Sequence, residues 1–151
     1  MLSPGARAPD FELPASGGRT VRLADFRGKK PIVLYFYPHD DTVGCTIESC
    51  SFRDAYEDFV AAGAEVIGVS VDSVASHDAF GAKHRLPFLL ASDPDDRTAR
   101  AYGVEKSFVG TRGRVTFVID RDGIVRDSFS SLLRFTAHVS RALELVRSWK
   151  A

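Results

Sequence analysis

Two cysteines, Cys45 and Cys50, are the residues of this chain best suited to redox chemistry, and they lie five positions apart. Cys45 follows an apolar run over residues 31–37 and opens a stretch with a helical pattern, so it is expected near the first turn of a helix. Backbone N–H groups and the helix dipole favour the ionised form of a thiol at such a place. Because the thiolate is the nucleophilic form, the pattern points to redox chemistry rather than to a structural cross-link.

The spacing constrains what the two thiols can do together. In a regular helix, Cα atoms of residues five apart lie roughly 8–9 Å from each other, and the side chains point about 140° apart. A disulfide needs Cα atoms within about 7 Å, so Cys45 and Cys50 can bond only if at least one helical turn unwinds. Terminal turns are among the less stable parts of a fold, which makes such an opening feasible. The spacing alone is equally compatible with two buried thiols that have no redox role.

The neighbours of Cys45 form a cluster that suits a small ligand. Thr42 could cap the helix or orient a bound oxygen with its hydroxyl, and Gly44 would let the backbone approach a ligand closely. Pro38 ends the preceding apolar run, and Glu48 lies one helical turn after Cys45, where it could position a cation beside the thiolate. Each residue also has a structural interpretation, as a cap, a strand stop or a first-turn charge. The cluster as a whole favours a reaction site.

These residues resemble a known active-site signature. Pro38-x-x-x-Thr42-x-x-Cys45 has the form of the peroxiredoxin motif, and residues 35–54 resemble the Q-type subfamily, also called bacterioferritin comigratory proteins, almost throughout. The resemblance extends from Pro9 to Asp120 and covers most of the chain. It implies a thioredoxin-dependent peroxidase that acts in antioxidant defence and works without a cofactor.

The resemblance also implies a role for each cysteine. Cys45 would be the peroxidatic thiolate that attacks hydrogen peroxide or an organic hydroperoxide and becomes a sulfenic acid. Cys50 would be the resolving cysteine, and the two would form an intramolecular disulfide. Thioredoxin or a similar dithiol protein would then reduce this disulfide. Subfamily resemblance further implies a monomer.

Supporting roles follow from the same resemblance. Thr42 and Arg114 would hold the peroxide oxygens and stabilise the thiolate, and Pro38 would shield the site. Glu48 would orient an arginine of this network. Val43 is a departure, because many relatives have a second proline there; the loop is then expected to be looser, with the reacting groups intact. The chain after residue 129 also matches less clearly.

The bulk composition is that of an ordinary globular domain. The chain has 151 residues, of which 44% are hydrophobic and 26% charged, so we expect one domain over residues 1–151 that needs no disulfide or metal to fold. Twenty basic and twenty acidic residues cancel, which removes any global argument for binding nucleic acid or an acidic membrane. With no apolar leader or membrane-length run, a cytoplasmic location is expected.

The histidines give no convincing metal site. His39, Asp40 and Asp41 are adjacent, and adjacent residues in a turn rarely converge on one ion, so a solvated loop is expected. The other three histidines, His77, His84 and His138, are expected at the surface. The sequence therefore predicts no bound metal.

Strand and helix patterns alternate along the chain. After an N-terminal hairpin, the order strand–helix is repeated and a final hairpin precedes the last helix, for which Thr136 is a plausible N-cap. The expected strands are 9–14, 20–23, 31–37, 64–71, 87–91, 114–120 and 124–129, and the expected helices are 43–62, 74–84, 95–102 and one after Thr136. This order predicts an α/β fold of the thioredoxin-like type, with a mixed central sheet flanked by helices.

Two rival functions are compatible with a redox-active pair. A thioredoxin-like disulfide reductase would place its thiols two residues apart rather than with four residues between them, so the spacing disfavours it. A redox sensor that signals through a Cys45–Cys50 bridge would use the same local unfolding. Peroxide turnover with a thioredoxin system separates the sensor from the peroxidase.

Overall fold

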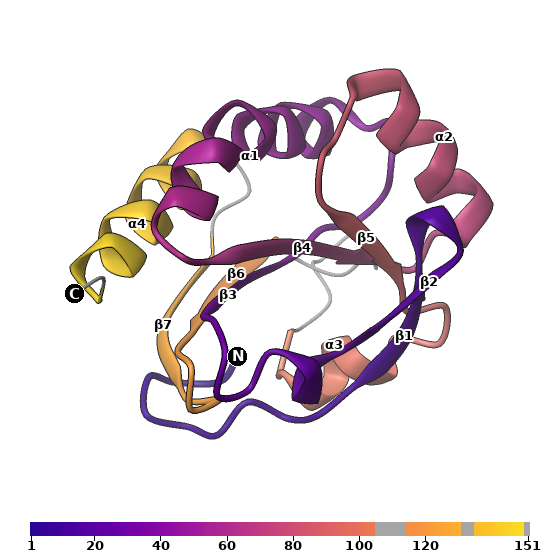
Figure 1. Ribbon diagram of the computed structural model, residues 1–151. Helices are drawn as coiled ribbons and strands as arrows, with labels where there is room; N and C mark the ends of the chain where they lie inside the picture. The colour runs from indigo at the N-terminus through magenta and orange to yellow at the C-terminus, as the bar shows by residue number, and fades with distance from the viewer. Residues whose placement is uncertain (105–113, 131–134, 150–151) are drawn as a thin grey trace.

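The computed structural model describes residues 1–104, 114–130 and 135–149, and a seven-stranded mixed sheet runs through its centre (Figure 1). The strand order across the sheet is β2-β1-β5-β4-β3-β6-β7. The strands are β1 (Glu12–Ala15), β2 (Arg19–Arg22), β3 (Ile32–Phe36), β4 (Glu65–Ser70), β5 (Leu89–Ser92), β6 (Val115–Ile119) and β7 (Val125–Ser130). Each strand overlaps the segment that the sequence predicts for it.

Three parallel strands, β5, β4 and β3, form the centre of the sheet, and antiparallel neighbours extend it on both sides. All five residues of β3 are buried, as the continuous apolar run predicts for a strand covered on both faces. The antiparallel pairing of β3 with β6 sets Phe36 opposite Val115. Residue 114, just before β6, therefore lies beside the C-terminal end of β3. From this end of β3 the chain continues into the first helix.

The α-helices of the described residues are α1 (Val43–Ala61), α2 (Val74–His84), α3 (Arg97–Ala101) and α4 (Phe135–Ser148). Helices α1, α2 and α4 cover one face of the sheet, and α3 lies on the opposite face (Figure 1). The first face is filled by an aromatic cluster that includes Tyr35, Phe52 and Phe80. The predicted mixed sheet with flanking helices is confirmed.

Helix ends follow local sequence signals with small differences. Gly63 has φ +82°, a left-handed conformation typical of a glycine that follows the C-terminal end of a helix, here α1. Helix α4 begins at Phe135, so Thr136 lies inside its first turn and the predicted N-cap is wrong.

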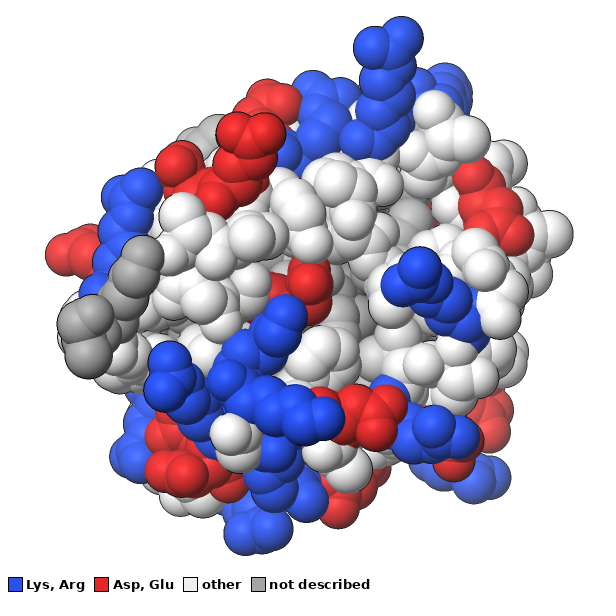
Figure 2. All heavy atoms as spheres, in the orientation of Figure 1, with Lys and Arg blue, Asp and Glu red and all other residues white. Residues whose placement is uncertain are grey.

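Charged side chains of both signs are interspersed on the face of the molecule shown in Figure 2. Uncharged residues separate them, in keeping with equal numbers of acidic and basic residues. In the described ranges, none of the helices is both long and apolar enough to cross a membrane.

Candidate active site

Cys45 lies in the first turn of α1, directly after the loop that leaves β3. Its side chain is 1% exposed, whereas Cys50 is half-buried, and both thiols are free. Helix α1 runs without interruption through both positions. The expected separation of roughly 8–9 Å between their Cα atoms therefore applies, and a disulfide needs the helix start to unwind.

Arg114 joins the sulfur of Cys45 to a buried carboxylate. Its Nη2 donates to Cys45 Sγ at 3.3 Å, and its Nη1 donates to Glu48 Oε1 at 2.9 Å. The Arg114 side chain is 5% exposed, and the Glu48 side chain is fully buried. Burial works against the charge on Arg114, but Glu48 and Cys45 outweigh it and raise the pKa of the guanidinium. The fork of Arg114 thus brings a permanent positive charge to the Cys45 sulfur.

Glu48 is held in an apolar setting that disfavours its own ionisation. Burial raises the pKa of its carboxyl to about 7, although the charge of Arg114 and its hydrogen bond work in the opposite direction. Near neutral pH this carboxyl is therefore close to the midpoint of its titration. When Glu48 is protonated, it carries no negative charge, and the positive charge of Arg114 then faces the Cys45 sulfur without a competing carboxylate.

His138 completes the network from the last helix, which contradicts the expected surface position. The side chain is 2% exposed, and its Nδ1 lies 2.8 Å from Thr116 Oγ1 and 3.3 Å from Glu48 Oε2. Burial, together with the positive charges of Arg114 and Arg141, lowers the pKa of His138 to about 4, so it is neutral at neutral pH. His138 is four residues before the buried Ala142, a spacing that already indicates the inner face of the helix.

The loop between β3 and α1 carries the remaining predicted site residues. Thr42 occupies the N-cap position, but its hydroxyl donates to the carbonyl of His39 at 2.9 Å and makes no side-chain cap bond to the helix. The Thr42 oxygen keeps its lone pairs for other donors. Pro38 is half-buried at the start of this loop, and Gly44 lies in the first turn of α1.

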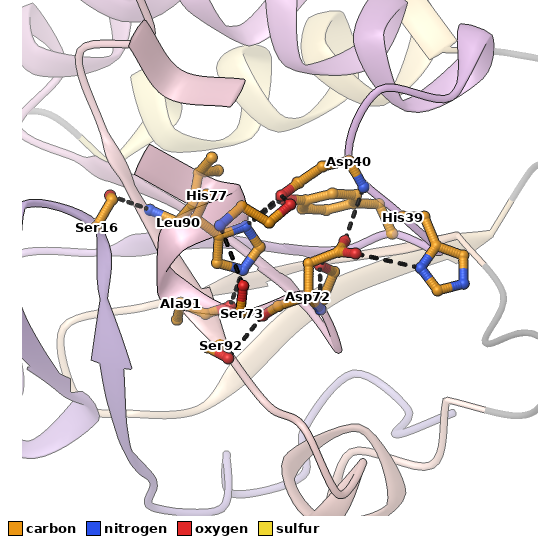
Figure 3. Close-up of polar contacts among 12 residues, drawn as sticks. Ser16, His39, Asp40, Asp72, Ser73, His77, Leu90, Ala91 and Ser92 are labelled. Atoms are coloured by element: carbon orange, nitrogen blue, oxygen red, sulfur yellow. Dashed lines mark hydrogen bonds and ion pairs between the residues drawn. The ribbon is translucent and has the colours of Figure 1, made fainter. Parts of the chain in front are cut away.

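The same loop is only in part the solvated segment that the sequence predicts, because the His39 and Asp41 side chains are 43% and 54% exposed but Asp40 is not. The Asp40 side chain is 3% exposed and contacts His77, which is fully buried rather than at the surface (Figure 3). Helix α2 packs against the loop and removes these side chains from water, a long-range effect that adjacent residues in the sequence do not reveal. His84, also expected at the surface, is partly buried against the Phe80 ring.

Comparison with known proteins identifies what this arrangement is similar to. The family model described as "AhpC/TSA family" matches residues 4–128. A chloroplastic peroxiredoxin Q of Triticum aestivum is 44% identical over 148 residues, which span 97% of this chain and 68% of that protein. A chloroplastic peroxiredoxin Q of Sedum lineare is 43% identical over 150 residues, 99% of this chain and 80% of that protein.

Solved structures give the same result. The peroxidoxin BcpB of Mycobacterium tuberculosis superposes with a TM-score of 0.93 at 36% identity, over 100% of both chains. The peroxiredoxin Q of Xanthomonas campestris superposes with a TM-score of 0.85 at 35% identity, over 93% of this chain and 92% of that one. A further Xanthomonas campestris structure, of a bacterioferritin comigratory protein, is described in terms of its alkyl peroxide reduction activity.

Proposed function

The chain belongs to the AhpC/TSA family, with peroxiredoxin Q proteins among its relatives, and from this premise we propose that Cys45 is the peroxidatic thiolate of a thiol peroxidase. The chain has the thioredoxin-like fold of these peroxiredoxins. The observation that carries the proposal is the Arg114 guanidinium, which contacts both the Cys45 sulfur and the Glu48 carboxylate. A buried thiol beside a fixed cation at a helix start is suited to react as its anion.

The first step is attack of the Cys45 thiolate on one oxygen of a hydroperoxide. The S–O bond forms as the O–O bond breaks, sulfur is oxidised to a sulfenic acid, and the second oxygen leaves as water or an alcohol after taking up a proton. Arg114 stabilises the negative charge that moves from sulfur to the leaving oxygen. We assign to Thr42, whose hydroxyl donates to the His39 carbonyl, the role of holding the peroxide, and to Pro38 that of shielding the reacting atoms.

The second step needs the start of α1 to open. Cys50 then reaches Cys45, its thiolate attacks the sulfenic sulfur, and hydroxide leaves and is protonated to water as the intramolecular disulfide forms. A dithiol protein of the thioredoxin type reduces this disulfide by thiol–disulfide exchange and restores both thiols. All electrons come from the thiols. We keep the monomeric state and the cytoplasmic location as predictions, the former to be measured by analytical ultracentrifugation.

Peroxide consumption by wild type, Cys45→Ser and Cys50→Ser, in the presence of thioredoxin and its reductase, tests the proposal. Wild type should turn over repeatedly, and Cys45→Ser should be inactive. Cys50→Ser should consume about one equivalent of peroxide and then recycle poorly. Undiminished turnover by Cys45→Ser would falsify the assignment, and a wild type that stops after one equivalent would favour the redox sensor.

A further inference from the structure

A buried ion pair ties the loop before Cys45 to helix α2. His77 Nδ1 lies 2.8 Å from Asp40 Oδ2, and the two side chains are 0% and 3% exposed (Figure 3). Asp40 belongs to the loop that runs from the end of β3 to Thr42, and His77 lies in the first turn of α2. The pair therefore joins two segments 37 residues apart in sequence, one of which is the loop that leads to Thr42 and Cys45.

Both partners make further hydrogen bonds at this buried position. The other ring nitrogen of His77, Nε2, lies 3.0 Å from the Ala91 carbonyl, which can only accept, so Nε2 carries hydrogen. Asp40 also accepts from the hydroxyls of Tyr37 at 2.6 Å and Ser76 at 2.8 Å. Burial would raise the pKa of Asp40, but its hydrogen bonds from His77, Tyr37 and Ser76 and the His77 charge lower it overall. The two ring nitrogens of His77 thus link the Asp40 carboxylate to the Ala91 carbonyl.

The backbone of the same loop is held from a third direction. Asp72, which follows β4, accepts from the Asp40 N–H at 2.7 Å through Oδ2, and the same oxygen accepts from the Ser70 hydroxyl at 2.7 Å. Asp40 is therefore fixed through its main chain by Asp72 and through its side chain by His77. A second pair, Lys83 with Asp41, also joins α2 to the loop, but both of its side chains are more than half exposed.

A bound cation is a weaker interpretation of this cluster. Ligand atoms of Asp40, Asp72 and His77 lie within 4.8 Å of one another. However, the carboxylates already accept from hydroxyl and N–H groups, and both nitrogens of His77 face acceptors. A metal ion needs a free lone pair on the imidazole, which this arrangement uses for hydrogen.

We propose that His77, through its buried ion pair with Asp40, is a positioning residue for the peroxidase reaction: it fixes the loop that carries Pro38 and Thr42 against the Cys45 thiolate. This inference rests on the proposed function. Arg114 approaches the sulfur from the position just before β6, and its contacts within the described residues are with Cys45 and Glu48. The loop therefore affects how peroxide is held, whereas Arg114 affects the nucleophile itself. The two effects are separable by experiment.

The test compares two reactions of the same sulfur. In a Cys50→Ser background, where Cys45 is the only thiol, rate constants are measured for oxidation by hydrogen peroxide, with dimedone trapping and mass spectrometry, and for alkylation by iodoacetamide. His77→Leu and Asp40→Ala should each lower the peroxide rate constant about tenfold, because small displacements of positioning groups are costly. Alkylation, which needs no peroxide pocket, should change less than twofold.

Two further variants sharpen the test. Lys83→Met removes the exposed pair on the same loop and should leave both rate constants within twofold of the parent. The double variant His77→Leu/Asp40→Ala leaves no buried charge without its partner, so it should fold even where a single variant does not. It should lose no more peroxide reactivity than either single variant, because the two residues act as one unit.

The outcomes distinguish the two proposals. A Cys50→Ser parent that alkylates normally but reacts with peroxide no faster than free cysteine overturns the proposed function. A fast parent whose folded variants keep their peroxide rate constants overturns the positioning role alone. Equal losses in oxidation and alkylation, or losses that multiply in the double variant, also contradict it.

Discussion

Arg114 is the residue on which the chemistry of the site depends most directly. One guanidinium faces a sulfur and a carboxylate, and its planar fork directs a different nitrogen to each. The Glu48 carboxylate fixes the rotation of that fork. The second nitrogen is therefore already directed at Cys45 before the reaction begins. A charge that is pre-organised in this way stabilises a transition state without a cost of reorganisation.

Replacing Arg114 by lysine tests this geometry. A single ammonium cannot contact both partners in the same way, so we expect the second-order rate constant for Cys45 oxidation to fall about 10- to 100-fold. Stopped-flow oxidation under single-turnover conditions measures it. Arg126→Lys, at an exposed arginine, serves as control and should be near wild type. A rate constant within twofold of wild type for Arg114→Lys would show that charge alone suffices.

Glu48 gives the site a measurable dependence on pH. Its folded-state pKa of about 7 lies above the ordinary value of 4.5, so between these values the folded state binds more protons than the unfolded state. Stability contributed by Glu48 therefore decreases as pH rises from about 4.5 to 7. His138 acts in the opposite sense, because its pKa is lowered to about 4 and its contribution is lost as pH falls below about 6.5.

Glu48→Gln removes one of these two titrations. The unfolding free energy of the variant, relative to wild type, should increase between pH 4.5 and 7 by on the order of 2–3 kcal/mol, since one pKa unit corresponds to about 1.4 kcal/mol. Urea titrations at several pH values measure this difference. Glu57→Gln, at an exposed position on the same helix, should show no such trend. A difference that stays constant over this range would contradict the raised pKa.

At the scale of elements, the start of α1 has two tasks that conflict. The intact first turn presents Cys45 to Arg114, whereas disulfide formation requires that turn to unwind. Val43 is the first residue of the helix and is 79% exposed, so it contributes little packing that would resist opening. Thr42 before it has φ −80° and ψ 153°, an extended conformation that a following proline favours.

Val43→Pro should shift this balance toward the folded helix. Proline suits the first helical position and restricts the unfolded chain, so the unfolding free energy should rise by about 0.4–1 kcal/mol. Disulfide formation after oxidation of Cys45 should slow by a factor of about 2–5, because that stabilisation must be overcome when the turn opens. Rapid-quench mass spectrometry follows the disulfide. Faster resolution in the proline variant would contradict this account.

At the scale of the whole molecule, the sheet determines where α1 sits. Tyr35 on β3 stacks on Phe52 with ring centroids 4.6 Å apart and contacts Ser49 Oγ at 2.9 Å, so it holds the helix next to Glu48. Gly68 on β4 makes room for that ring. A Cβ atom there would lie 2.7 Å from Tyr35 Cζ and 2.9 Å from Leu90 Cδ2.

Gly68→Ala should therefore destabilise the fold. The methyl group must displace Tyr35 or Leu90 in a filled core, and we expect a loss of about 1–3 kcal/mol in urea-unfolding free energy. Gly81→Ala is the matched control, because a Cβ there meets nothing within 4 Å and Gly81 lies inside α2. It should stabilise the protein by about 0.5–1 kcal/mol. A Gly68→Ala variant as stable as wild type would refute this packing argument.

Local patterns were enough to predict most elements, because β-branched runs, helical periodicity and glycine stops act over a few residues. The limits of α2 were predicted to the residue, and the Cys45 region was identified from its own motif. Arg114 was reached only through family resemblance, since nothing near residue 114 relates it to a thiol 69 positions away. The antiparallel pairing of β3 with β6 supplies that relation.

The sequence by itself determined the two thiols, their spacing and the order of strands and helices, because these depend on covalent connectivity and local periodicity. Only the tertiary structure decided the surroundings of the histidines. His77 and His138 each lie on a helix, and the sequence around them does not show whether they are buried. Their burial depends on partners from distant segments: Asp40 for His77 and Glu48 for His138. Long-range packing sets the local dielectric and the partners, and with them the charge that each titratable group carries.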